Sequence, residues 1–557
     1  MNTRQRAGIV LAALFFGFSA AGPNPSPGFA QAAKELEAGA FTDFRSSVRE
    51  FGELFKLIRA TLSHNKVTFQ GKTGPISGFA AGSAYPQIWL RDASTIIPAS
   101  RFLYETPFLR SWIEEHLAFQ RADGSLEDWI DSRGKADKNT TETDQETSAV
   151  RAAAAVTKLI GPDWLAKNIR GETVLARLEK ALDFVLLNRF DKVHGLITGA
   201  HTADWGDVDM NAPDQRAIYV DGATHWTCDI YDQSQFHAAS LDLAWMLDAG
   251  GQGSKAGPWR EKAALIRKNA DQWLWQEDKG FYRVHIHLDA LKHAFDEDAM
   301  FPMGGNAEAV ISGLASEDKS RRIFEAALAR QKQYSISTIS GVILPPYPKG
   351  TFKHPMVDQP YEYQNGGQWD WFGGKLVAAM FERGFSRPAR EKLLEIAGKA
   401  AANKGLYEWD SPAGKGRGSA FYSGSAGSLG LALIEGYFGF KISRDRLSLE
   451  PRLGEDAATV HVYLPAADVF AAYSYQWDER AGLMTLRFNS SIAGRGTVKL
   501  LIPWVKDAVA GVEWPAASDV RLDGAKAAFR TEVIHHDALL TVETDFKNHV
   551  LTVKRPR

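Results

Sequence analysis

Cysteine is almost absent from this sequence. Cys228 is the single one among 557 residues, so no intrachain disulfide can form and packing alone must stabilise the fold. We expect Cys228 to be a small buried residue and not a nucleophile. An excess of one charge sign is also missing, since 65 basic and 67 acidic residues leave a formal net charge of -2. No basic stripe follows a phosphate backbone, so nucleic acid is not expected as a partner.

Long hydrophobic runs are missing except at the N-terminus. Arg4 and Arg6 precede an apolar run from Ala7 to Ala21, and small residues continue to Ala30. This pattern predicts an export signal over residues 1–30, which makes the mature protein periplasmic or secreted. The run is too short to span a bilayer. No integral membrane segment is expected after the signal is removed.

The length of the chain predicts two domains, because one ordinary core holds about 150 residues. We expect a helical domain over residues 31–442 and a second domain over residues 443–557.

Apolar residues recur every three or four positions through most of the first domain. From Phe44 to Leu62, for example, they mark one face of a helix. About twelve such segments pair into six helical hairpins. Long loops rich in Gly, Pro, Asp and Trp connect them, and we expect these loops to line one mouth of a helical ring. The long loops cover residues 64–92, 189–230, 332–367 and 403–423.

Past Ser443 the apolar period changes from helical to alternating, as in Val460-Val462-Leu464. This change predicts a C-terminal β-sandwich that packs against the helical ring. The predicted fold class is therefore mainly α, an (α/α)6 toroid of six helical hairpins with a C-terminal β-sandwich.

Two clusters of carboxylates and tryptophans lie in loops between predicted helices. One covers residues 202–209 and contains Trp205 and Asp207, and the other covers residues 405–410 and contains Glu408. Splitting a glycosidic bond requires an acid that protonates the departing oxygen and a base that activates water. Tryptophan rings stack on sugars and raise the pKa of a neighbouring carboxyl group by excluding water. The alternative interpretation is that these acids are ordinary surface residues of loops.

A third motif covers residues 87–92, just ahead of a helix expected to begin around Ser94. It contains Trp89, Arg91 and Asp92. Arginine only donates hydrogen bonds and an ionised aspartate only accepts them, so the pair can hold adjacent sugar hydroxyls. The alternative is that the helix dipole favours Asp92 and that Arg91 is its surface partner.

Taken in order, these motifs resemble those of the six-hairpin glycosidases, which include glucoamylases, glycogen-debranching glucosidases, trehalases and neutral invertases. Residues 89–92 followed by Pro98 are similar to the first sugar-gripping motif, and Asp144 opens a helix where those families have an acid. Residues 364–370 resemble the Asn-Gly-Gly-x-Trp motif of neutral invertases and the Gln-Trp-Asp motif of trehalases. The resemblance covers residues 80–440.

The resemblance implies that Asp207 is the general acid and Glu408 the general base of an inverting exo-glycosidase. Asp204 and Asp209 stay open as alternatives for the acid, because a one-step slip in aligning the loop exchanges them. The acid loops of trehalases and neutral invertases differ from this one, so trehalose and sucrose are not favoured. The resemblance implies an α-glucoside or a related oligosaccharide as the substrate. The implied sugar-binding residues are Trp89, Arg91, Asp92, Asp144, Trp205, Asn365, Trp369 and Trp409.

No cofactor is expected, and no metal. His285 and His287 lie two positions apart, without a Cys, Asp or Glu that completes a recognisable zinc spacing.

Three other functions stay open. A phosphorylase on the same fold would replace water by phosphate and would need a basic or histidine-lined pocket. A polysaccharide lyase would use Tyr and His. A carbohydrate-binding protein without catalysis would keep the tryptophans and tolerate the loss of either carboxylate.

Overall fold

The computed structural model describes residues 36–141, 143–506, 508 and 517–556. The predicted export signal lies outside these residues. Twelve α-helices are found in the described chain, in agreement with the number expected from the apolar periodicity. They are α2 (Arg49–His64), α3 (Leu90–Ser100), α4 (Thr106–Phe119), α5 (Asp144–Ile160), α6 (Val174–Asn188), α7 (Ile230–Ala249), α8 (Ala256–Trp273), α9 (Met303–Ile311), α10 (Glu317–Gln333), α11 (Asp370–Glu382), α12 (Ser386–Asn403) and α13 (Ser423–Gly430), the last continued by a π-helix (Leu431–Tyr437).

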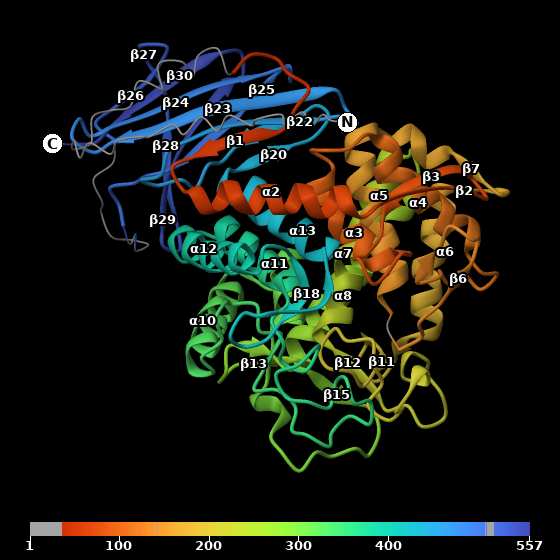
Figure 1. Ribbon diagram of the computed structural model, residues 1–557. Coiled ribbons are helices and arrows are strands. Elements are labelled where there is room, and N and C mark those ends of the chain that lie inside the picture. Colours follow the sequence, from red (N-terminus) through yellow and green to blue (C-terminus); the bar gives the residue numbers. More distant parts are fainter. Residues whose placement is uncertain (1–35, 142, 507, 509–516, 557) are drawn as a thin grey trace, which may run out of the picture.

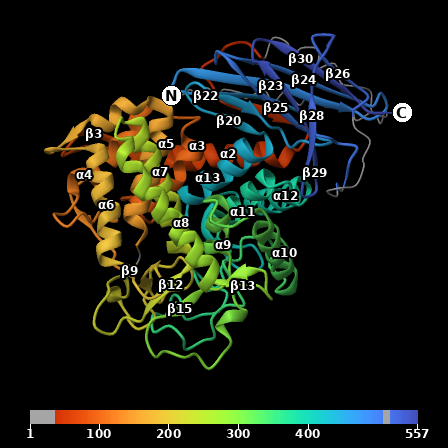
Figure 2. The ribbon, with the colours of Figure 1, turned by 180° about the vertical axis from the view of Figure 1, so that it is seen from behind.

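The helices form a closed ring of two layers (Figures 1 and 2). Alternate helices contact one another in a cycle through α3, α5, α7, α9, α11 and α13, and α13 returns to α3. The other six helices cover the outside. Inner and outer helices differ in sequence accordingly, because α13 is buried along its whole length, whereas α2 buries one stripe that includes Phe51, Phe55 and Ile58. The predicted toroid is therefore confirmed.

Short strands connect many of the helices, and several lead directly into an inner helix: β4 into α3, β12 into α7 and β16 into α9. These three strands orient the first turns of the helices that follow them. The short strands of the helical part are β2 (Lys66–Gly71), β3 (Gly74–Phe79), β4 (Ile88–Trp89), β5 (Trp129–Ile130), β6 (Ala136–Asp137), β7 (Asn168–Ile169), β8 (Glu172–Thr173), β9 (Phe190–Asp191), β10 (Leu196–Ile197), β11 (Gly199–Ala200), β12 (Trp226–Asp229), β13 (Trp275–Gln276), β14 (Phe281–Tyr282), β15 (His285–His287), β16 (Phe301–Pro302), β17 (Ile343–Leu344), β18 (Tyr407–Asp410) and β19 (Gly416–Ala420).

Two larger sheets form the β domain beside the ring (Figure 1). Phe440 stacks on Tyr473 across the two sheets with ring centroids 5.1 Å apart. One sheet has the order β1 (Asp43–Ser46), β22 (Ala458–Leu464), β23 (Val469–Asp478), β24 (Leu483–Ser490), β30 (His549–Lys554), β26 (Asp519–Leu522) and β27 (Ala525–Lys526), and the other has the order β20 (Phe440–Ile442), β21 (Leu447–Leu449), β25 (Arg495–Leu501), β29 (Asp537–Asp545) and β28 (Arg530–Ile534).

The start of the described chain corrects one expectation. Phe44 does not begin a helix, since it lies in β1 and pairs with Val460 of β22. Its ring still contacts the helical stripe, at 4.9 Å from the ring of Phe55 and 4.4 Å from that of Phe438. Apolar spacing therefore identified the contact but not the backbone conformation, because a strand residue can face the same core as the next helix.

The class "mainly α" is not confirmed, since 39% of the structure is helix and 25% is strand. The short hairpins within the helical part add strand that apolar periodicity does not reveal. Cys228 is fully buried in β12, as expected. No helix in the described part of the chain combines the length and apolar character needed to cross a membrane.

The close approach of α13 to α3 gives a test of the ring. A Cβ atom on Gly427 would lie 2.3 Å from the Thr95 carbonyl oxygen and 2.7 Å from the Cα of Ile96. Gly427→Ala must separate the two helices, so we predict that it lowers the free energy of unfolding by about 1–3 kcal/mol in urea denaturation.

The matched control is Gly398→Ala in outer helix α12, where a Cβ atom meets nothing within 4 Å. This change should raise the free energy of unfolding by up to about 1 kcal/mol, because alanine favours helix. Equal stability of both variants would contradict the close packing of α13 on α3.

Candidate active site

A pocket lies where the inner helices begin, and it encloses about 390 Å³ of space free of protein atoms, its open mouth included. Aromatic rings and carboxylates form most of its wall. The lining residues are Ala81, Tyr85, Trp89, Arg91, Asp92, Trp205, Asp207, Tyr363, Gln364, Trp369, Glu408 and Tyr422.

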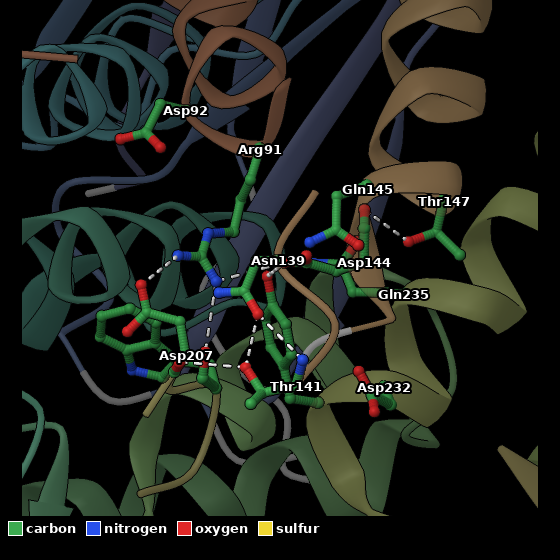
Figure 3. Close-up of polar contacts among 12 residues, drawn as sticks. Arg91, Asp92, Asn139, Thr141, Asp144, Gln145, Thr147, Asp207, Asp232 and Gln235 are labelled. Carbon is green, nitrogen blue, oxygen red and sulfur yellow. Dashed lines mark hydrogen bonds and ion pairs between the residues drawn. The ribbon is translucent and has the colours of Figure 1, made fainter. Parts of the chain in front are cut away.

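Asp207 enters the pocket from the long loop between β11 and β12. Its Oδ1 accepts a hydrogen bond from the Gln364 amide at 2.7 Å. Its Oδ2 lies 3.8 Å from a guanidinium nitrogen of Arg91 (Figure 3). The Thr141 hydroxyl donates to the main-chain oxygen of Asp207 at 3.0 Å. The Asp207 side chain is 20% exposed. The carboxyl group is therefore oriented by neighbours yet accessible from the pocket.

Glu408 enters the same pocket from β18. Its Oε1 and Oε2 accept hydrogen bonds from the Tyr85 hydroxyl at 3.0 and 3.2 Å, and the main-chain N–H of Ser419 donates to Oε2 at 2.8 Å. Only 4% of the residue is exposed. Burial raises the pKa of Glu408 to about 7, although the hydrogen bonds from Ser419 and Tyr85 oppose the shift.

Arg91 and Asp92 belong to the first turn of α3 and connect the starts of several inner helices. Arg91 lies 3.5 Å from Asp144 at the start of α5, and Asp144 accepts a hydrogen bond of 2.8 Å from the Tyr231 hydroxyl in the first turn of α7. Asp92 accepts a bond of 2.7 Å from the hydroxyl of Tyr422, the residue before α13. The pocket therefore depends on the ring as a whole.

Asp204 and Asp209, the alternatives for the acid, do not line the pocket. Asp204 is buried and accepts hydrogen bonds from the N–H groups of Gly304 and Gly305 at 2.8 and 3.0 Å, at the start of α9. Burial raises its pKa to about 8. Asp209 accepts a bond of 2.7 Å from the N–H of Asn211. Both acids organise the loop that carries Asp207.

The other expected sugar-binding residues divide into two groups. Trp89, Trp205 and Trp369 line the pocket, whereas Asp144, Asn365 and Trp409 do not. Asp144 is fully buried and orients Arg91 from outside the pocket.

Asn365 is not directed at the pocket either. Its amide holds the main chain of Tyr347, accepting from the N–H at 2.7 Å and donating to the carbonyl at 3.1 Å. The glycine-rich turn that contains Asn365 is therefore bonded to the segment that contains Tyr347.

Tyr85, Tyr363, Gln364 and Tyr422 line the pocket but were not among the expected site residues. Gln364 is the first residue of the motif over 364–370, so its position carried a signal. Tyr85 lies in the loop over 64–92 expected at the mouth of the ring, but no pattern distinguished it from other loop tyrosines.

No metal-ligand cluster of the described residues lies in the pocket itself. One group that could hold a metal ion lies elsewhere and consists of His201, His287, His293 and Glu297. The spacing of the histidines in the sequence did not reveal Glu297 as their partner.

No family model matches the chain, and no curated protein matches it by sequence. Solved structures do match it. A GH78 family rhamnosidase of Bacillus sp. GL1 superposes with a TM-score of 0.58 at 14% identity, covering 84% of this chain and 43% of that one. An alpha-L-rhamnosidase from Dictyoglumus thermophilum gives 0.61 at 11% identity, covering 92% and 50%. A GH63 mannosylglycerate hydrolase from Thermus thermophilus gives 0.50 at 15% identity, covering 68% and 100%.

These three proteins belong to the six-hairpin glycosidases with the (α/α)6 toroid, so the fold that the motif resemblance implied is confirmed. At identities this low the likeness establishes a shared fold. The chain spans half or less of the length of the two rhamnosidases.

The raised pKa of Glu408 gives a test that needs no substrate. Its pKa of about 7 in the folded chain exceeds the ordinary 4.5, so its contribution to stability is full at low pH and is lost as the pH rises toward about 7. Glu408→Gln cannot ionise. We predict that, relative to wild type, this variant gains about 2–3 kcal/mol in the free energy of unfolding between pH 4.5 and pH 8.

The difference between the two pH values is the measured quantity, because hydrogen bonds lost by the substitution affect both equally. The exposed Glu391, changed to Gln, serves as control and should show no such difference. A Glu408→Gln variant that gains nothing at pH 8 would contradict the raised pKa.

Proposed function

We propose that the protein is an inverting exo-glycoside hydrolase in which Asp207 is the general acid and Glu408 the general base. The observation that carries the proposal is that these two carboxylates, from loops far apart in the sequence, line one pocket together with Arg91 and Asp92. Two carboxyl groups on either side of a scissile bond are the minimum equipment for hydrolysis. An inverting mechanism needs room for water, so we expect their oxygens to lie about 6.5–9.5 Å apart when substrate is bound.

The acid role suits Asp207 because it is the accessible carboxyl group of its loop. Gln364 binds one oxygen, while the other oxygen lies on the side of Arg91. A sugar bound in the pocket would remove the remaining contact of Asp207 with water. The protonated form of this carboxyl group is the one that can donate to the glycosidic oxygen.

The base role suits Glu408 because donors surround its carboxylate. The Tyr85 hydroxyl and the Ser419 N–H support the ionised form, which is needed to take a proton from water. Burial opposes ionisation, so the resting group has a pKa of about 7. A base with a pKa near the working pH combines a sufficient ionised fraction with sufficient basicity.

Substrate binding is assigned to Arg91, Asp92 and the tryptophans that line the pocket. Arg91 and Asp92 offer donors and an acceptor to adjacent hydroxyls, and Trp89, Trp205 and Trp369 offer apolar faces to a sugar ring. A single compact pocket favours a terminal sugar, hence exo action. We propose a terminal α-glucoside or a related oligosaccharide, and rhamnosides and mannosylglycerate enter the substrate panel because structurally similar proteins carry those names.

Export belongs to the same proposal. The predicted signal over residues 1–30 would deliver the enzyme to the periplasm or the medium, where oligosaccharides are available as substrates.

The first test is hydrolysis of the panel by wild type, Asp207→Asn and Glu408→Gln, with Asp204→Asn and Asp209→Asn for comparison. We predict that kcat falls at least about a hundredfold in the first two variants, because each removes one proton-transfer group. Proton NMR of the first product should show the anomeric configuration opposite to that of the substrate. Full activity of Asp207→Asn or of Glu408→Gln, or turnover that requires phosphate, would overturn the proposal.

A second test separates the two roles through the leaving group. An activated phenol departs without protonation, so Asp207→Asn should lose far less activity on such an aryl glycoside than on a natural substrate. Glu408→Gln should lose about a hundredfold or more on both, since activation of water is still required. The reverse pattern would exchange the roles of the two residues.

A third test uses the pH dependence of kcat/KM. Because the base must be ionised, activity should fall as the pH drops below about 7, the pKa of Glu408. Tyr85→Phe removes a hydrogen bond to the carboxylate, so this acidic limb should move to higher pH by about one unit. An acidic limb that stays in place, or moves to lower pH, would exclude Glu408 as the group that titrates.

A further inference from the structure

Four histidines and one glutamate converge outside the pocket, although they come from separate segments. His201 follows β11, His285 and His287 belong to β15, and His293 and Glu297 lie in the segment after it. The side chains of His201 and His285 are fully buried, and those of His287 and His293 are 19% and 7% exposed. Histidine is only intermediate in its tendency to be buried, so the gathering of four largely buried histidines around one carboxylate requires an explanation.

The distances within this cluster match the first coordination sphere of a small metal ion. The Nε2 atoms of His201 and His293 lie 3.0 Å apart, and each lies 3.4 Å from Oε1 of Glu297. A tetrahedron with metal–ligand bonds of about 2.0–2.1 Å has edges of about 3.3–3.4 Å. One proton can bridge one pair of these atoms but not three pairs at once.

The fourth ligand is supplied by His287. Its Nε2 lies 2.8 Å from Oε2 of Glu297, and the ligand atoms of His201, His287, His293 and Glu297 all lie within 4.8 Å of one another. Three imidazoles and one carboxylate are a donor set that suits zinc and similar divalent transition metals.

Glu297 accepts a further hydrogen bond of 2.7 Å from the Tyr347 hydroxyl, which holds its carboxylate in place beside the imidazoles.

We propose that His201, His287, His293 and Glu297 bind a divalent transition metal ion of the zinc class. The ion fastens the loop that carries Asp207 (residues 201–225, between β11 and β12, here called the acid-bearing loop) to the segment over residues 285–297. None of the four lines the active-site pocket, so the ion positions residues and does not touch substrate.

The link to the acid-bearing loop is direct. His201 precedes Asp207 by six positions, its N–H donates to the His225 carbonyl at 2.8 Å, and its carbonyl accepts from the N–H of Met210 at 3.2 Å. The main chain of His201 is therefore bonded to two other parts of the same loop, so a metal that fixes the His201 ring also fixes the loop.

A second connection runs through Tyr347. Its hydroxyl binds Glu297, and its main chain is held by Asn365, the residue after Gln364. Gln364 in turn binds Asp207. The metal would therefore support Asp207 from two sides.

The decisive measurement is the metal content of full-length protein produced without a polyhistidine tag. After removal of metal with a chelator, the protein is titrated with Zn²⁺, Co²⁺, Ni²⁺ and Mn²⁺. We expect one ion per chain, visible bands of tetrahedral Co²⁺, and metal–nitrogen distances of about 2.0–2.1 Å by X-ray absorption of the zinc form. The Tm should rise by roughly 2–3 °C at a metal concentration a hundredfold above Kd.

Two variants test the ligand assignment. His287→Gln removes a partly exposed ligand and should fold, and His293→Gln removes a buried one. Each should weaken binding by about a hundredfold or more. The control is His225→Gln, which removes a histidine paired with Asp289 outside the cluster and should bind metal as wild type does.

Hydrogen exchange then tests the positioning role. Removal of metal should speed exchange in residues 199–229 and leave the β domain unchanged. The proposal is overturned if wild type binds no more metal than His287→Gln, or if none of the four ions gives a Tm shift. It is also overturned if the acid-bearing loop exchanges equally with and without metal.

Discussion

The site depends on one constraint, namely that the six inner helices begin at the same mouth of the ring. The start of a helix presents N–H groups without partners in that helix and carries a partial positive charge. Asp204 accepts from two such groups of α9, and Asp229 accepts from the N–H of Asp232 in the first turn of α7. Acidic residues gather at this mouth because the helix ends stabilise them. Asp207 and Glu408 come instead from the loop between β11 and β12 and from β18, which meet in the pocket at this mouth.

This arrangement reduces stability near neutral pH. Burial raises the pKa of Asp204 to about 8 and that of Glu408 to about 7, so ionising either group opposes folding. The fold offsets part of this cost with buried partners. Two positions after Glu408, Asp410 lies 2.6 Å from the ammonium of Lys399, which also lies 2.7 Å from Asp370 at the start of α11. Removing such a cation would leave two buried carboxylates without their partner.

Local patterns predicted the helices and much of the site, because each depends on neighbouring positions in the chain. Apolar periodicity found the helices, and the motifs identified residues that do line the pocket, among them Arg91, Trp205 and Trp369. Asn365 shows where this reasoning stops. An amide binds a backbone as readily as a sugar, and the backbone it binds belongs to Tyr347, which only the folded chain brings near. The partners of the acids, such as Tyr85, also come from distant loops without periodic pattern.

The sequence by itself determined the number of helices, the alternation of the C-terminal strands and the presence of acids and tryptophans in the long loops. Only the tertiary structure decided that Asp207 lines the pocket while Asp204 binds the start of α9, and that His201 meets His293 and Glu297. The reason is physical. Periodicity reports which face of a regular element is buried, whereas a loop residue acquires its neighbours from contacts between segments that lie far apart in the chain.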